Sequence, residues 1–138
     1  MGRIMAIDYG QKRSGIAVTD PMQLIATGLE TVPSHQLLAF LSAYFNTEQV
    51  DRVVVGEPKD MQNNASDASR FTEPFVLKLK AAFPAMRIER YDERFTSKMA
   101  FQSMIDAGLS RKRRQDKALV DTISATLILQ SYLEFINR

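Results

Sequence analysis

Three consecutive valines, Val53, Val54 and Val55, constrain the fold more than any other feature of the sequence. Neighbouring side chains of a strand point to opposite faces, so an unbroken apolar run predicts a strand that is buried on both faces. Such strands belong to sheets that carry helices on both sides. We therefore expect residues 52–56 to form a strand of an α/β domain.

The segments around this strand predict the element order βββαβαβαα. The first three strands have short connections, which favour antiparallel pairing, whereas the later strand–helix–strand passages favour parallel pairing. We expect a single domain over residues 1–138, with a mixed five-stranded sheet of three antiparallel strands and then two parallel ones, flanked by helices. The other strands are expected at 3–8, 15–19, 27–32 and 86–91, and helices at 34–45, 67–83, 97–107 and 117–136.

Three details of these segments are also predicted. Residues 8–15 resemble a hairpin connection, in which Gly10 and Gly15 would supply unusual backbone angles. Ser34 is expected to cap the first helix. Pro74 is expected either to kink the second helix or to mark its true start.

Composition excludes several classes of protein. The absence of cysteine removes disulfides, zinc–thiolate sites and thiol nucleophiles, and it fits a reducing compartment. Asp8 interrupts the amino terminus too early for the apolar stretch of a signal peptide. No run reaches the roughly 20 apolar residues of a membrane span. We expect a cytoplasmic protein with no membrane partner.

Positive charge is concentrated in one segment, although the net charge of the chain is only +2. Between Leu109 and Lys117 only Asp116 opposes the basic side chains, which are those of Arg111, Lys112, Arg113, Arg114 and Lys117. A local positive patch on a nearly neutral body favours a polyanionic partner such as nucleic acid. A solvated loop explains the charges equally well.

Acidic residues lie at three places where a catalytic role is consistent with the predicted elements. Asp8 ends the first predicted strand, Asp92 and Glu93 end the fifth, and Asp121 lies near the start of an apolar last helix. Each also has a structural explanation, such as capping a helix or favouring its dipole. Acids from separate elements that converge at one sheet edge would suit Mg²⁺, which prefers hard oxygen ligands. The sequence alone does not show that they converge.

Four motifs resemble the YqgF (RuvX) family of bacterial RNase H-like proteins. They are DYGQKRSGIAVTD at 8–20, VVGEP at 54–58, DERFT at 92–96 and KALVDTISA at 117–125. The resemblance covers essentially the whole chain and implies an RNase H-like fold. It also implies a site in which Asp8, Glu93 and Asp121 are the catalytic, metal-binding acids. By the same match, the residues expected to contact phosphate are Lys12, Arg13, Arg94 and Lys117. Glu57 stands where the family usually has an apolar residue, and it is either a further ligand or an ion-pair partner.

The resemblance implies an endonuclease that hydrolyses phosphodiester bonds with Mg²⁺ or Mn²⁺, using two ions. Its expected role is 5′-end processing of pre-16S ribosomal RNA, with ribosomal precursor particles as further partners. Arg111, Arg113 and Arg114 would then follow the substrate backbone. Two alternatives stay open: a Holliday junction resolvase acting on branched DNA, and a non-catalytic RNA-binding assembly factor. An ATPase of the actin and sugar-kinase type needs a second lobe, for which 138 residues leave no room.

Overall fold

The computed structural model describes residues 2–57, 69–92 and 116–137 of the chain. Five strands lie in this part: β1 (Arg3–Asp8), β2 (Arg13–Thr19), β3 (Ala26–Pro33), β4 (Val50–Glu57) and β5 (Arg87–Asp92). The helices are the short 3₁₀ helix η1 (Ser34–Gln36), α1 (Leu37–Thr47), α2 (Ser69–Ala82) and α5 (Lys117–Ile136). The helix expected at 97–107 lies outside the described residues.

The five strands form one mixed sheet in the order β3-β2-β1-β4-β5. Strand β1 pairs antiparallel with β2 and parallel with β4. Strand β3 pairs antiparallel with β2, and β5 pairs parallel with β4. The expected architecture, three antiparallel strands followed by two parallel ones, is therefore confirmed.

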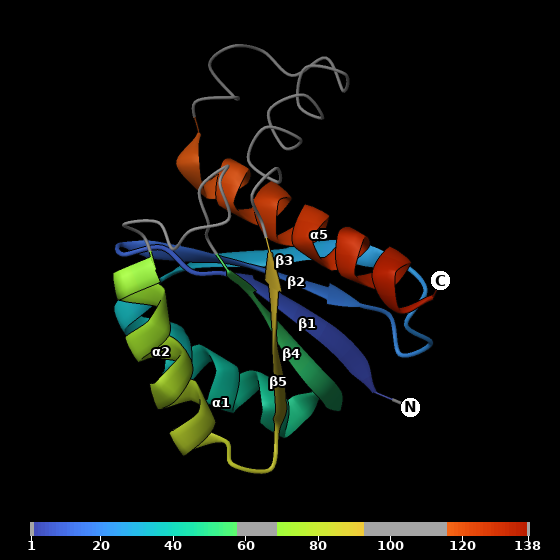
Figure 1. Ribbon diagram of the computed structural model, residues 1–138, viewed down its shortest axis with the longest axis horizontal. Coiled ribbons are helices and arrows are strands. Elements are labelled where there is room, and N and C mark those ends of the chain that lie inside the picture. Colours follow the sequence, from blue (N-terminus) through green and yellow to red (C-terminus); the bar gives the residue numbers. More distant parts are fainter. Residues whose placement is uncertain (1, 58–68, 93–115, 138) are drawn as a thin grey trace.

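Helices cover both faces of the sheet, with α5 on one side and α1 and α2 on the other (Figure 1). The three valines of β4 are completely buried, and they divide between the two sides. Val53 and Val55 belong to the core under α1 and α2, and Val54 belongs to the core under α5. This is the doubly covered strand that the valine run predicts.

Helix α5 is long and apolar enough to cross a membrane, by length and composition alone. Its packing on the sheet accounts for that apolar character, because Ala125, Ile128 and Leu129 are fully buried against β1, β2 and β4. Charged and polar side chains interrupt its apolar residues, so the helix contains no continuous apolar run of spanning length.

One local prediction about a helix start is wrong, and one of the two alternatives for Pro74 is excluded. Ser34 does not cap α1: it begins η1, and its hydroxyl donates to the carbonyl oxygen of Gly10 at 2.5 Å. Pro74 lies inside α2, one and a half turns after the start at Ser69, so it does not mark the start. Pro74 is the sixth residue of α2, so its ring stands where a backbone N–H would donate to the carbonyl oxygen of Arg70.

Candidate active site

Three parallel strands end at the same edge of the sheet, called here the carboxyl edge. Their last residues are Asp8 of β1, Glu57 of β4 and Asp92 of β5, and Glu57 and Asp92 are direct register partners. Because successive side chains of a strand point to opposite faces of the sheet, Asp8 points to the same face as Ile4 and Ala6, which pack against α5. Glu57 instead alternates with Val53 and Val55, which face α1 and α2. Asp8 is thus placed on the α5 side of the edge.

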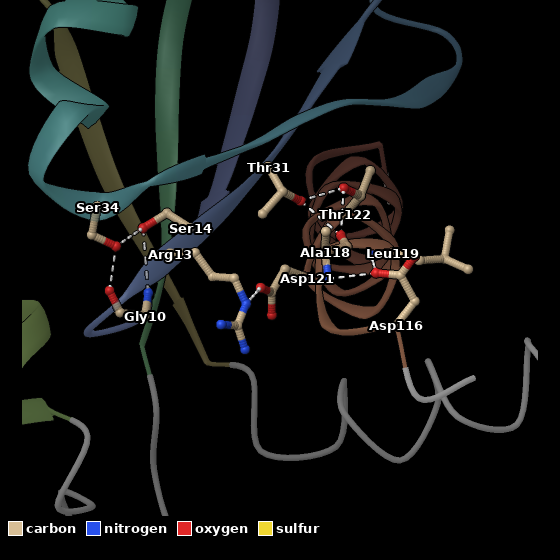
Figure 2. Close-up of polar contacts among 10 residues, drawn as sticks. All are labelled: Gly10, Arg13, Ser14, Thr31, Ser34, Asp116, Ala118, Leu119, Asp121 and Thr122. Atoms are coloured by element: carbon tan, nitrogen blue, oxygen red, sulfur yellow. Dashed lines mark hydrogen bonds and ion pairs between the residues drawn. The ribbon is translucent and has the colours of Figure 1, made fainter. Parts of the chain in front are cut away.

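Asp121 reaches this edge from the first turns of α5. The helix begins after Asp116, whose carboxylate accepts from the backbone N–H groups of Ala118 and Leu119 at 3.1 and 3.4 Å. Side chains also tie its start to β3, as Figure 2 shows. The Thr31 hydroxyl donates to the carbonyl of Ala118 at 2.7 Å and lies 2.6 Å from the Thr122 hydroxyl. The Asp116 cap and the contacts of Thr31 in β3 therefore hold the first turns of α5, which carry Asp121.

Glycines in the sheet allow α5 to come this close. A Cβ atom on Gly15 of β2 would lie 2.0 Å from the backbone carbonyl oxygen of Asp121. One on Gly28 of β3 would lie 2.4 Å from a methyl group of Thr122. Gly15 was expected to supply an unusual turn angle, and that is wrong: it lies within β2, without a left-handed φ, and its role is the close approach.

The close packing of α5 on β2 brings the carboxylates of Asp8 and Asp121 near enough to interact electrostatically. Burial raises the pKa of Asp8 to about 7, and the nearby charge of Asp121 adds to the rise. Burial also raises the pKa of Asp121, although Arg13 and Lys117 oppose this effect. A pair of carboxylates with raised pKa values is poorly neutralised, and it gains stability from any cation bound between them.

Arg13 supplies part of the missing positive charge. Its Nε atom lies 3.0 Å from Oδ2 of Asp121, and neither of these buried atoms hydrogen-bonds to another group in the described residues. The guanidinium points from the start of β2 toward the carboxylate (Figure 2). This ion pair holds the Asp121 side chain at the carboxyl edge.

The turn before Arg13 is pinned by two serines. Ser14 and Ser34 lie with their hydroxyl oxygens 2.8 Å apart, and both contact the backbone of Gly10. The backbone N–H of Ser34 also donates to the carbonyl of Lys12 at 2.9 Å. These contacts hold the turn that carries the exposed Lys12, for which a phosphate contact is predicted.

The chemistry of this pair fits a divalent cation. Both side chains offer carboxylate oxygens, the ligands that Mg²⁺ and Mn²⁺ prefer, and the buried Oδ2 of Asp121 has Nε of Arg13, at 3.0 Å, as its partner in the described residues. Within the described residues no three acidic, histidine or cysteine side chains form a metal-binding group. Glu93, the third predicted acid, lies outside those residues and follows Asp92 directly in the chain.

The other predicted site residues fall into two groups. Lys117 is the exposed first residue of α5, close enough to lower the pKa of Asp121. Those outside the described residues are Arg94, Arg111, Arg113 and Arg114. The ring of Tyr91, the residue before Asp92, packs edge-on against Tyr132 and Phe135.

Sequence reasoning missed the residues that place Asp121. The role of these residues appears only when α5 is packed against β2 and β3. They are Gly15, Gly28, Thr31 and Thr122. One signal was present: a glycine inside an apolar strand often marks a close backbone approach. Asp116 was counted only as an opposing charge, although an aspartate just before a helix is a common cap.

Comparisons with known proteins identify proteins to which this chain is similar. The family model of RuvX, described as a Holliday junction resolvase, matches residues 2–135. A relative from Flavobacterium psychrophilum named "Putative pre-16S rRNA nuclease" is 61% identical over 133 residues, covering 96% of this chain and 97% of the relative. A relative of the same name from Porphyromonas gingivalis is 52% identical over 138 residues and covers both chains completely.

A solved structure gives the fold. The RuvC protein of T. thermophilus, determined in complex with a Holliday junction substrate, superposes with a TM-score of 0.58. The match has 17% sequence identity and covers 98% of this chain and 96% of that one. The expected RNase H-like fold is confirmed by this match together with the strand order.

Proposed function

The chain belongs to the RuvX family, and on this premise we propose that it is a metal-dependent endonuclease that processes the 5′ end of pre-16S ribosomal RNA. The observation that carries the proposal is the meeting of Asp8 and Asp121 at the carboxyl edge, where burial and mutual repulsion raise the pKa of Asp8 to about 7. Burying two acids close together costs stability, and a bound cation offsets that cost, so the arrangement favours a cation-binding pair. The names of the relatives supply the substrate.

In this proposal Asp8, Asp121 and Glu93 hold the divalent ions. The ions, when bound, supply positive charge for the phosphate and lower the pKa of the attacking water. Asp8 is fixed by the end of β1 and Asp121 by the glycine contacts of α5, so the ligands are organised before substrate arrives. Arg13 and Lys117 lie close to Asp121, and in the proposal these two side chains and that of Lys12 contact the phosphate backbone.

No histidine is assigned a role as general base. His35, the sole histidine of the chain, is exposed in η1 on the α1 side of the molecule. A site built on carboxylates and hydrated divalent ions does not need one. The acids therefore carry the chemistry, and their conversion to amides is the direct test.

The test uses purified wild-type protein with Asp8→Asn and Asp121→Asn variants. Each is incubated with a labelled pre-16S 5′-leader RNA and a mobile four-way DNA junction, in Mg²⁺, Mn²⁺ or chelator. We expect discrete, metal-dependent cuts in the RNA that both variants lose. Glu134→Gln is the matched control, because Glu134 is an exposed acid at the far end of the same helix. Wild-type turnover by both aspartate variants would show that these acids are not the site.

A second candidate function is resolution of Holliday junctions, which the description of the matched family favours. The same acids would act on branched DNA. Cutting of the four-way junction without cutting of the RNA would replace the first function with this one. Binding of either substrate with no cleavage under any metal condition would indicate a non-catalytic assembly factor.

A further inference from the structure

A second feature lies at the carboxyl edge, on the opposite face of the sheet from Asp121. It is a cavity of about 330 Å³ between the end of β1, η1, α1 and the first turns of α2. This volume lies in the range of sites for small ligands. The residues used below line it and define what we call the Phe71 pocket: Tyr9, Gln11, His35, Phe71, Phe75 and Lys78.

The walls of the Phe71 pocket are flat aromatic rings. Tyr9 and Phe75 are stacked with their ring centroids 4.4 Å apart and their planes 9° apart. Phe71 is 37% exposed, and the Arg70 guanidinium lies 5.5 Å from the centroid of its ring. An aromatic ring that folding leaves exposed beside a cavity, with a cation next to it, is suited to stack on another flat ring.

The polar groups of the pocket select the kind of ring. Gln11 and His35 are exposed and offer hydrogen-bond donors and acceptors, and Lys78 adds a positive charge. None of the described residues that line the pocket is acidic. A purely apolar ligand would not use these groups, whereas a nucleobase has polar edges and carries a phosphate beside it.

The pocket is close to the proposed site of cleavage. Tyr9 directly follows Asp8, and consecutive Cα atoms are about 3.8 Å apart. Asp8 faces α5, whereas Tyr9 packs with the core under α1 and α2. A nucleic acid strand that crosses the end of β1 with a phosphate at Asp8 would therefore bring a nearby base over the opposite face.

We propose that the Phe71 pocket binds one unstacked nucleobase of a single-stranded substrate, close to the phosphate that is cleaved. This inference rests on the proposed nuclease function and adds the form of its substrate. A base cannot enter such a pocket while it is paired and stacked in a duplex. The pocket thus directs the protein to single-stranded segments, loops or ends.

The test measures binding without cleavage, in chelator, with the whole chain. The probe is a short labelled oligoadenylate with one 2-aminopurine, whose fluorescence falls when it stacks, placed at each position in turn. A second series replaces each nucleotide in turn by an abasic one. Variants are Phe71→Ala, Phe71→Leu and Phe71→Tyr, with Leu77→Ala as the matched control because Leu77 is an exposed apolar residue of α2 outside the pocket.

We expect the wild type, Phe71→Tyr and Leu77→Ala to quench 2-aminopurine at one preferred position. Loss of one stacked base weakens binding by about five- to one-hundred-fold, and we expect this from Phe71→Ala or from the abasic nucleotide at that position. Phe71→Leu should behave like Phe71→Ala, because it keeps the bulk and loses the flat face. In Phe71→Ala the abasic nucleotide should cause no further loss, because both changes remove the same contact.

Two other results have distinct meanings. If Phe71→Ala binds as tightly as the wild type and keeps the full abasic penalty, the pocket does not hold a base, even if the wild type cleaves RNA in Mg²⁺. If the base-dependent pattern appears but no RNA or DNA is cleaved in any metal, the nuclease proposal fails and the pocket assignment stands.

Discussion

Gly15 of β2 and Asp121 of α5 meet backbone to backbone: a Cβ atom on Gly15 would lie 2.0 Å from the carbonyl oxygen of Asp121 and 2.4 Å from its carbonyl carbon. Gly15 is also the register partner of Asp8 across the β1–β2 pair. One contact therefore sets the separation between the sheet that carries the first acid and the helix that carries the second.

We expect Gly15→Ala to impair activity far more than its size suggests. The added methyl group meets backbone atoms that cannot rotate away, so the start of α5 must move from the sheet. Overpacking of this kind costs about 1–3 kcal/mol of stability, and a displacement of about 1 Å at a reacting group can lower turnover about one-hundred-fold. The measurements are urea unfolding and cleavage of the leader RNA.

Gly28→Ala is the matched control for that substitution. Its new methyl group would meet a side-chain methyl of Thr122 rather than backbone, and Thr122→Ser removes that methyl while keeping the hydroxyl near Thr31. We expect the double variant Gly28→Ala/Thr122→Ser to recover activity. If Gly15→Ala were as active as the wild type, the contact would not control the placement of Asp121.

The metal-free protein should be more stable when Asp8 is neutral. Folding raises the pKa of Asp8 from 3.8 to about 7, so the folded state keeps a proton that the unfolded state releases. The cost of ionising Asp8 is absent below the unfolded pKa, grows as the pH rises between the two values and is complete above about 7. At 1.4 kcal/mol for each pKa unit, it reaches about 4 kcal/mol at most.

We therefore expect Asp8→Asn to exceed the wild type in free energy of unfolding near pH 8 by a few kcal/mol, and to match it near about pH 4. Urea unfolding in chelator at the two pH values measures this difference, with Glu134→Gln as the control acid on the exposed end of α5. A difference that does not change with pH would contradict the raised pKa.

Mg²⁺ should stabilise the wild type, because an ion that binds the folded state alone adds about 2.7 kcal/mol at one-hundred-fold excess over its Kd. Asp8→Asn and Asp121→Asn should lose most of this gain. The measurement is the melting temperature with MgCl₂ against NaCl of equal ionic strength. An equal rise in both variants would mean that the ion binds elsewhere.

Removal of Arg13 should destabilise the protein mainly when no ion is present. Arg13→Gln leaves Asp121 without its cation partner, at a cost of about 1 kcal/mol for a partly exposed pair. A bound divalent ion replaces that charge, so the loss should shrink in MgCl₂. The matched control is Arg3→Gln, which breaks the Arg3–Glu48 pair at the other end of the sheet and should cost the same with or without the ion. An equal loss in both conditions for Arg13→Gln would assign it a packing role.

The sequence predicted the sheet because its signals are local. The valines of β4 report burial on both faces, and short connections report antiparallel pairing, so the strand order follows with few alternatives. Asp8 was identifiable for the same reason, since it ends a strand just before a turn.

The geometry around Asp121 was not predictable in this way. It depends on how closely a helix approaches a strand more than one hundred residues earlier in the chain, which the Gly15 contact and the Thr31–Thr122 hydroxyl pair decide. Ser34 shows the same limit: its local pattern favours a cap, but the Gly10 carbonyl and Ser14 hydroxyl offer its side chain better partners. Contacts between distant segments override local preference at both places.

The basic segment should control how binding depends on salt. Each phosphate contact contributes roughly 0.7–0.9 log units of affinity for each log unit of salt, so Arg113→Ala/Arg114→Ala should reduce the slope by about 1–2. The measurement is the Kd for the leader RNA over a series of KCl concentrations. Arg87→Ala is the control, because Arg87 is an exposed arginine at the start of β5, away from the carboxyl edge. An unchanged slope in the double variant would show that the segment does not touch the RNA, and the charge on Lys12, Arg13 and Lys117 would then have to account for binding.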